Sequence, residues 1–280
     1  MALGLLGVLL FGEYKIPDMT LENLHINKES LPLVPTLFIT IACGAISGFH
    51  ATQSPLMARC VNNERECRFV FYGSMISESV IALIWAAISM AFFYEEGGIS
   101  AIMVGHTPAW VVNEISNTTL GIVGGILAVL GVVAAPITSG DTAFRSARLI
   151  IADVFHIEQK SKWKRLAIAL PLFSAGVALT FVDFDVVWRY FAWTNQALAT
   201  IVLWCIVVYL HLEKRNYWVA LIPAVFMTYI CASFVFVSKQ FVGMGAVPMA
   251  YIWGGLATLV LTGGMVYMMV RNNKYTQLKK

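Results

Sequence analysis

The chain has 280 residues, of which 59% are hydrophobic and only 12% are charged, and its formal net charge is +3. Soluble domains carry about twice that share of charged residues, so this composition excludes a soluble globular enzyme, a disordered chain and a nucleic-acid-binding protein. The class that remains is an all-α polytopic membrane protein, because only helices satisfy their own backbone polar groups in a single run of apolar residues through lipid.

Long apolar runs predict about seven transmembrane helices, since a span needs about 20 apolar residues. The predicted spans cover about 36–57, 69–94, 119–139, 166–182, 187–211, 217–237 and 247–270. The third span is expected to continue as a helix to about residue 156, and residues 95–118 are expected to be irregular or to hold a short interfacial helix. This division predicts a connecting segment over 1–35, a transmembrane bundle over 36–271 and a tail over 272–280.

The first segment, residues 1–35, combines a short apolar run with a polar stretch. Met1–Phe11 is apolar but is too short to cross a bilayer at about 1.5 Å rise per residue. Residues 12–35 are polar and contain three prolines. We interpret Met1–Phe11 as the end of a span that begins upstream, which makes the chain the back half of a larger transporter. An independently translated half-protein is the alternative.

The basic residues predict an orientation. With seven alternating spans, fifteen of the 19 Lys and Arg residues fall on one side, in three loops and the tail. The positive-inside rule places that side, and the C-terminus, in the cytoplasm, and places residues 1–35 outside. The expected location is the inner (plasma) membrane, with the lipid bilayer as the surrounding partner.

The first predicted span contains a polar cluster that is unusual at membrane depth. Gly44, Gly48 and Pro55 stand among side chains that favour a broken helix lining a substrate site. The candidate substrate-binding residues of this span are His50, Thr52, Gln53 and Ser54. Helical hydrogen bonding is expected to fail between Gly48 and Pro55, with His50 or Gln53 facing a cavity. The alternative is a kinked helix in which the glycines permit close packing.

The end of the third span predicts an ion site. Thr138, Ser139 and Asp141 follow Pro136, so hydroxyls and a carboxylate lie beside a backbone that proline loosens. Such oxygen donors suit Na⁺, or a proton carried by Asp141. The alternative is that Asp141 pairs with Arg145 one turn later. We expect Asp141 to pair and the two hydroxyls to coordinate the ion.

Three further polar residues lie inside predicted spans. Glu78 is an intramembrane carboxylate, which indicates either a functional site or a structural hydrogen bond. Asn195 and Gln196 are expected either to bridge helices or to line a substrate path. We include all three among the substrate-binding candidates. The sequence has no phosphate-binding loop, no H-E-x-x-H and no G-x-S-x-G, so we expect no enzyme, no metal site and no cofactor.

Several segments strongly resemble the carbon starvation protein A family. They are FITIACGAISGFHATQSPLMAR (38–59), VFYGSMISE (70–78), ALIWAA (82–87), PITSGDTAFR (136–145) and WTNQALA (193–199). The likeness covers most of residues 30–215. It implies an inner-membrane secondary transporter of peptides or pyruvate that is induced when carbon runs short. It also implies the second half of a fold similar to the leucine-transporter type, built on a five-plus-five inverted repeat.

Family members are much longer, and the missing N-terminal half would supply the other wall of the substrate site. The resemblance therefore implies that this chain requires that half for transport. Two other functions stay open from the sequence. One is a non-transporting membrane interaction or sensor subunit, and the other is an intramembrane enzyme, for which no activated nucleophile stands out.

Overall fold

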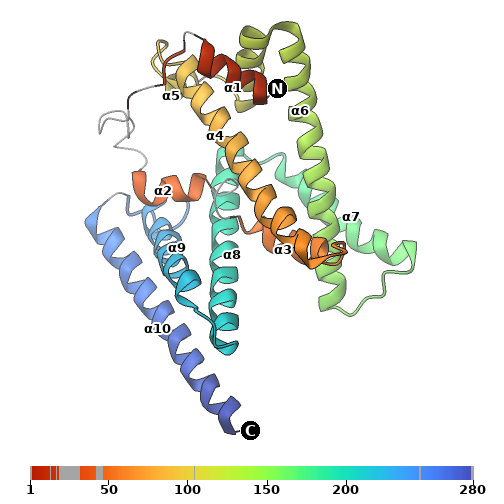
Figure 1. The fold of residues 1–280 in the computed structure, drawn as a ribbon, viewed down its shortest axis with the longest axis vertical. Coiled ribbons are helices and arrows are strands. Elements are labelled where there is room, and N and C mark those ends of the chain that lie inside the picture. Colours follow the sequence, from red (N-terminus) through yellow and green to blue (C-terminus); the bar gives the residue numbers. More distant parts are fainter. Residues whose placement is uncertain are drawn as a thin grey trace. The chain divides into compact units, whose positions relative to one another are not determined.

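The computed structural model describes residues 2–12, 14–16, 18, 32–41, 47–103, 105–245 and 247–278. Within these ranges the chain is helical and contains no strand, which confirms the all-α prediction (Figure 1). The α-helices are α1 (Ala2–Phe11), α2 (Leu33–Thr40), α3 (Phe49–Ala58), α4 (Ser74–Phe92), α5 (Ile99–Ile102), α6 (Pro108–Val154), α7 (Lys162–Leu179), α8 (Phe184–Leu212), α9 (Trp218–Val237) and α10 (Pro248–Leu278). A 3₁₀ turn, η1 (Glu64–Glu66), and a π-helical turn, η2 (Arg68–Gly73), precede α4.

The chain forms two compact units. The first comprises Met1–Leu24 and Val61–Ala175, and the second comprises His25–Cys60 and Gly176–Lys280. In the first unit, α1 packs against α4 and α6. Leu5 of α1 is fully buried in a cluster with Ile88 and Ile115. A ten-residue helix is marginal by itself, so this apolar packing is what stabilises α1.

In the second unit, α9 lies between α8 and α10 and packs against both (Figure 1). Ala224 and Ile230 of α9 are fully buried in the two clusters of this unit. The approach of α10 is close at Gly254, where an added Cβ would lie only 2.8 Å from the Cα of Ser233. Small residues at such a contact allow two helix backbones to approach closely.

Five helical stretches are long and apolar enough to cross a membrane among the residues described. They are Glu64–Phe92, Pro108–Gly131, Val186–Leu212, Trp218–Val237 and Pro248–Met269. These correspond to the second, third, fifth, sixth and seventh predicted spans. The fourth predicted span lies in α7, which has 18 residues and carries three basic residues in its first turn. The first corresponds to α2 and α3, so the count of seven stays a prediction.

Helix α6 differs from the predicted third span at its N-terminal end. It begins at Pro108, eleven residues before the predicted start, with the side chain of Thr107 accepting a hydrogen bond from the backbone N–H of Trp110 at 3.3 Å. Val111 and Ile115 are buried in the core of the first unit. This packing stabilises as part of α6 a stretch that the sequence predicts to be irregular or to hold a short interfacial helix. At the other end α6 runs to Val154, close to the predicted limit of about 156.

Candidate functional site: a helix interruption and its braces

The first predicted span is divided into two helices, and the division lies before the position that the sequence suggested. Helix α2 ends at Thr40, α3 begins at Phe49, and residues 42–46, with the predicted packing residue Gly44, lie outside the described residues. Helix α3 then continues through Pro55 to Ala58. The expected failure of hydrogen bonding between Gly48 and Pro55 is therefore wrong. A single proline removes only one backbone hydrogen bond from a helix, and α3 tolerates this loss.

Helix α8 braces both of these helix ends with two adjacent amide side chains. Asn195 Oδ1 accepts a hydrogen bond from the backbone N–H of Phe49 at 2.9 Å, at the start of α3. Gln196 Nε2 donates to the main-chain oxygen of Phe38 at 2.9 Å, near the end of α2. Helix ends leave backbone groups without intrahelical partners. Asn195 and Gln196, which are both buried, satisfy one such group on each side of the interruption.

The side chain of Gln196 keeps one unused hydrogen-bonding group. Its Oε1 is buried and has no hydrogen-bond partner among the described residues. The whole side chain is only 1% exposed. A buried acceptor without a partner is costly and rare in proteins, so this oxygen has an unmet requirement for a hydrogen-bond donor.

A glycine sets the distance between α3 and α8. Gly48 is buried, and a Cβ built on it would overlap the main-chain oxygen of Asn195 and lie 2.8 Å from the Cβ of Leu198. Its φ of −67° is ordinary, so the reason for glycine here is space and not backbone conformation. The close packing that the sequence offered as the alternative to a broken site is thus present together with the interruption.

The predicted substrate-binding residues of α3 form one half-buried polar group. His50, Gln53 and Ser54 share a helix face by their i, i+3 and i+4 spacing. Thr52 Oγ1 donates to the main-chain oxygen of Phe49 at 2.8 Å, and Gln53 Nε2 donates to Thr52 Oγ1 at 3.2 Å. The two cavities described below are lined by other residues, so the predicted cavity at His50 or Gln53 stays a prediction.

The backbone N–H groups at the start of α3 are already bonded. Those of His50 and Ala51 donate to the main-chain oxygens of Ser47 and Gly48 at 3.3 and 3.0 Å, and that of Phe49 donates to Asn195. A bare helix N-terminus attracts anions through unbonded N–H groups. Here an anionic substrate would have to bind through side chains instead.

Glu78, the remaining substrate-binding candidate, lies on α4 in the first unit, and its side chain is exposed. The residues that the structure brings together therefore come from α3 and α8 of the second unit. Among the described residues, no three His, Cys, Asp or Glu side chains lie close enough together to hold a metal ion.

The predicted ion-site residues lie on one turn of α6. Asp141 Oδ2 accepts a hydrogen bond from Arg145 Nη2 at 2.6 Å, which confirms the predicted pairing. Thr138 and Ser139 are exposed, and the main-chain oxygen of Thr138 accepts from Thr142 Oγ1 at 2.9 Å. The helical dihedral angles of α6 fail at Gly121, which has a φ of 66°. The turn that carries Thr138 and Ser139 is helical, and their coordination of an ion stays a prediction.

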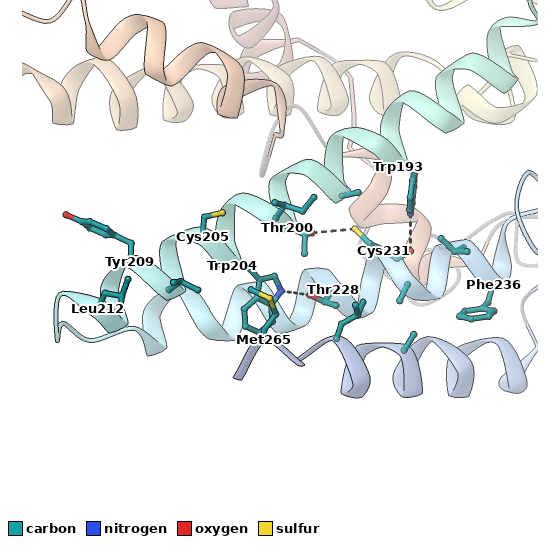
Figure 2. A pocket seen from close by; sticks show the side chains of 17 residues that line it. Trp193, Thr200, Trp204, Cys205, Tyr209, Leu212, Thr228, Cys231, Phe236 and Met265 are labelled. Atoms are coloured by element: carbon teal, nitrogen blue, oxygen red, sulfur yellow. Dashed lines mark hydrogen bonds between the residues drawn. The ribbon is translucent and has the colours of Figure 1, made fainter. Parts of the chain in front are cut away.

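A large cavity in the second unit has a different chemical character. It has a volume of about 840 Å³ and is lined by α8, α9 and α10 (Figure 2). Four of its polar side chains lie in pairs: Trp204 Nε1 donates to Thr228 Oγ1 at 3.0 Å, and Thr200 Oγ1 lies 3.6 Å from Cys231 Sγ. A charged solute would lose its hydration there without replacement. This cavity suits hydrocarbon and not the carboxylate of a small metabolite.

Comparison with known proteins decides the family. The family model "Carbon starvation protein CstA" matches residues 1–130. An uncharacterized protein of Haemophilus influenzae is 52% identical over 124 residues, which are 44% of this chain and 90% of that protein. The chain belongs to the carbon starvation protein CstA family. The sequence resembles the family over most of residues 30–215. The match to the family model starts earlier, at residue 1, and it ends at residue 130, before Asp141.

Two named transporters match shorter segments. The pyruvate/proton symporter BtsT of Escherichia coli is 47% identical over 66 residues, which are 23% of this chain and 9% of that protein. The peptide transporter CstA of Campylobacter jejuni is 42% identical over 87 residues, 30% of this chain and 12% of that protein. The chain thus spans a small part of these transporters. No solved structure matches it significantly.

Proposed function

We propose that this chain is part of a secondary transporter that takes up peptides or pyruvate across the inner membrane. The observation that carries the proposal is the pair of helix ends at Thr40 and Phe49, braced by Asn195 and Gln196. Interrupted helices are tolerated in membranes where they are buried in protein or line a cavity, and they form the solute sites of many transporters. Membership of the CstA family supports the same function.

The proposed substrate class follows from the polar side chains that lie beside the interruption. Peptides and pyruvate both carry a carboxylate. Because the first N–H groups of α3 are bonded within the protein, we assign the carboxylate to the polar face formed by His50, Gln53 and Ser54. The free Oε1 of Gln196 accepts hydrogen bonds only, which suits the ammonium or amide N–H of a peptide and has no counterpart in pyruvate.

Uptake assays test this proposal. Cells that lack their own uptake systems would express the gene with its upstream coding region, and labelled dipeptide and labelled pyruvate would be supplied in parallel. We expect Gln53→Ala to reduce uptake at unchanged protein abundance, and Asn62→Ala, an exposed position before η1, to leave it unchanged. Absence of uptake of both substrates by the abundant wild-type protein would instead favour the non-transporting membrane subunit.

For energy coupling we propose an ion site at Thr138 and Ser139, with Asp141 engaged in its pair with Arg145. Neutral hydroxyl ligands suit a monovalent cation such as Na⁺. The double substitution Thr138→Ala with Ser139→Ala should abolish Na⁺-dependent uptake. Unchanged uptake in this variant at every Na⁺ concentration and pH would contradict the ion site, and an uptake that follows pH alone would identify the proton as the coupling ion.

We propose that the C-terminus lies in the cytoplasm, from the grouping of fifteen basic residues on one side of seven spans. A C-terminal fusion to green fluorescent protein should fluoresce, and a fusion to alkaline phosphatase should be inactive. The reverse pattern would refute the orientation.

We also propose that transport requires a further segment, corresponding to the N-terminal half of the longer relatives, as the other wall of the site. Expression of the 280 residues alone should give no uptake, and co-expression with that half should restore it. Uptake by the 280 residues alone would refute this requirement.

A further inference from the structure

A second, smaller cavity lies in the first unit between α6 and α7. Its volume is about 270 Å³, near the lower limit of roughly 300 Å³ for small-molecule pockets. Helix α6 contributes Asp141, Phe144, Arg145 and Arg148, and α7 contributes Leu172 and Phe173 among its apolar residues. The rings of Phe144 and Phe173 lie 4.4 Å apart and join the two helices beside the cavity.

The charges that line this cavity do not balance. Arg145 is paired with Asp141 at 2.6 Å. Arg148, one turn further along α6, is half-buried, and its Nε is buried without a hydrogen-bond partner among the described residues. Buried charged groups in proteins are paired or bound to an ion, and an unsatisfied one requires an explanation. Arg148 is therefore the cation of this cavity that has no ion-pair partner among the described residues.

The cavity lies at the boundary between apolar and basic sequence on both helices. The apolar run of α6 ends at Ile137, so Asp141 is one turn beyond it. On α7, Leu172 and Phe173 follow the basic first turn by about two turns. Trp163 in that first turn is 80% exposed, and Leu170 beyond it is 59% exposed. Basic residues with an exposed tryptophan are typical of the lipid headgroup level, and the exposed apolar residues beyond them suit an acyl chain.

We propose that α6 and α7 form a binding site for a singly charged oxyanion, the phosphodiester of an anionic phospholipid, with Arg148 as its ligand beside the Asp141–Arg145 pair. The guanidinium group presents N–H donors in a planar fork that matches two oxygens of such a group. The pair limits the site to one net positive charge, which matches the single charge of a phosphodiester. This site is separate from the interruption between α2 and α3 and does not depend on the proposed substrate uptake, although its Asp141 lies on the same turn of α6 as the proposed ion site.

Lipid titration of the purified full chain tests this assignment. Binding of phosphatidylglycerol and phosphatidylcholine would be measured by native mass spectrometry and by the shift in unfolding temperature. We expect phosphatidylglycerol to bind at least tenfold more tightly than phosphatidylcholine. Arg148→Gln should remove that preference, whereas Arg215→Gln, in the exposed turn after α8, should keep it. Asp141→Asn should strengthen phosphatidylglycerol binding severalfold, because it releases the positive charge of Arg145.

Two further measurements separate a lipid site from a site for a free solute. Glycerophosphoglycerol, which carries the same singly charged phosphodiester without acyl chains, and pyruvate, which carries a singly charged carboxylate, would be added without lipid to separate a lipid headgroup from a free solute. Binding of either solute with the same dependence on Arg148, without a preference for phosphatidylglycerol, would overturn the lipid assignment. Equal binding of the two lipids by the wild-type chain would overturn the site itself. If Arg148→Gln does not fold, Arg148→Lys keeps the charge but loses the fork, and an unchanged lipid preference in it would also count against the site.

Discussion

Two proline-containing segments carry similar side chains and fold differently. Residues 47–58 and 134–145 both combine small residues, hydroxyl groups and one proline. The first follows a helix interruption, and the second lies inside α6. The difference lies in the partners. Asn195 of α8 accepts from the backbone N–H of Phe49 at the start of α3, and Gln196 donates to the main-chain oxygen of Phe38 near the end of α2. In the second segment Thr142 and Arg145 bond within their own helix. A helix thus ends where another element satisfies its backbone, and a proline alone does not end it.

The largest effect should come from Gly48→Ala. The added methyl group would overlap the main-chain oxygen of Asn195, so α3 would have to move away from α8. Overpacking of this kind costs about 1–3 kcal/mol or more. Thermal unfolding in detergent, followed by tryptophan fluorescence, would measure the loss.

Gly140→Ala is the matched control in the other segment. An added Cβ at Gly140 meets nothing within 4 Å, and alanine favours a helix by up to about 1 kcal/mol over glycine. This variant should be as stable as the wild type or more stable. Equal destabilisation by the two substitutions would contradict the difference between the segments.

Asn195→Ala should have the second largest effect. It leaves the N–H of Phe49 buried without its acceptor, which costs about 1–3 kcal/mol. The unfolding temperature should fall, and hydrogen exchange of the first turn of α3 should accelerate. Asn117→Ala, on an exposed part of α6, should change neither quantity, and slow exchange at Phe49 in the Asn195 variant would show that another group caps α3.

Gln196→Met tests the hydrogen bond between α8 and the end of α2. Methionine fills a similar volume but cannot donate to the main-chain oxygen of Phe38, so we expect a loss of about 1–2 kcal/mol, reduced because the unpaired Oε1 is removed as well. In the uptake assay the same variant should reduce the uptake of a dipeptide more than the uptake of pyruvate. Equal effects on both substrates would argue for a purely structural role.

The smallest effect should come from Asp141→Asn. The side chains of Asp141 and Arg145 are 66% and 58% exposed, and an exposed i, i+4 ion pair contributes about 0.5 kcal/mol or less. A double-mutant cycle with Arg145→Gln would measure the coupling. A coupling free energy above about 1.5 kcal/mol would mean that this turn is held by contacts beyond its own helix.

The apolar runs predicted α4, α8, α9 and α10 well, because long hydropathic stretches have few alternatives to a spanning helix. The end of α2 could not be predicted in the same way. It depends on hydrogen bonds from Gln196 and Asn195, which lie about 150 residues away in the sequence. Periodicity and proline positions describe the local chain and carry no information about such a contact.

The start of α6 and the role of Arg148 in the small cavity could not be predicted from the local sequence either. Residues 95–118 were expected to be irregular or to hold a short interfacial helix, but from Pro108 onward they belong to α6, where Val111 and Ile115 pack into the core of the first unit. Arg148 was counted only as one of the residues that orient the chain. Its spacing of three from Arg145 was the available signal, since it places both guanidinium groups near one face of α6.

Helix α9 has the highest mean hydropathy of the five candidate spans, 2.2, and it is also the most enclosed by protein. One face of α9 packs against α8 and α10, whereas Val219 and Ile222 on the same helix remain exposed. Such an apolar sequence enters the bilayer readily during synthesis, before α10 exists to cover it. Because α10 follows α9 in the chain, the close contact between Ser233 and Gly254 can form only after α10 has been synthesised.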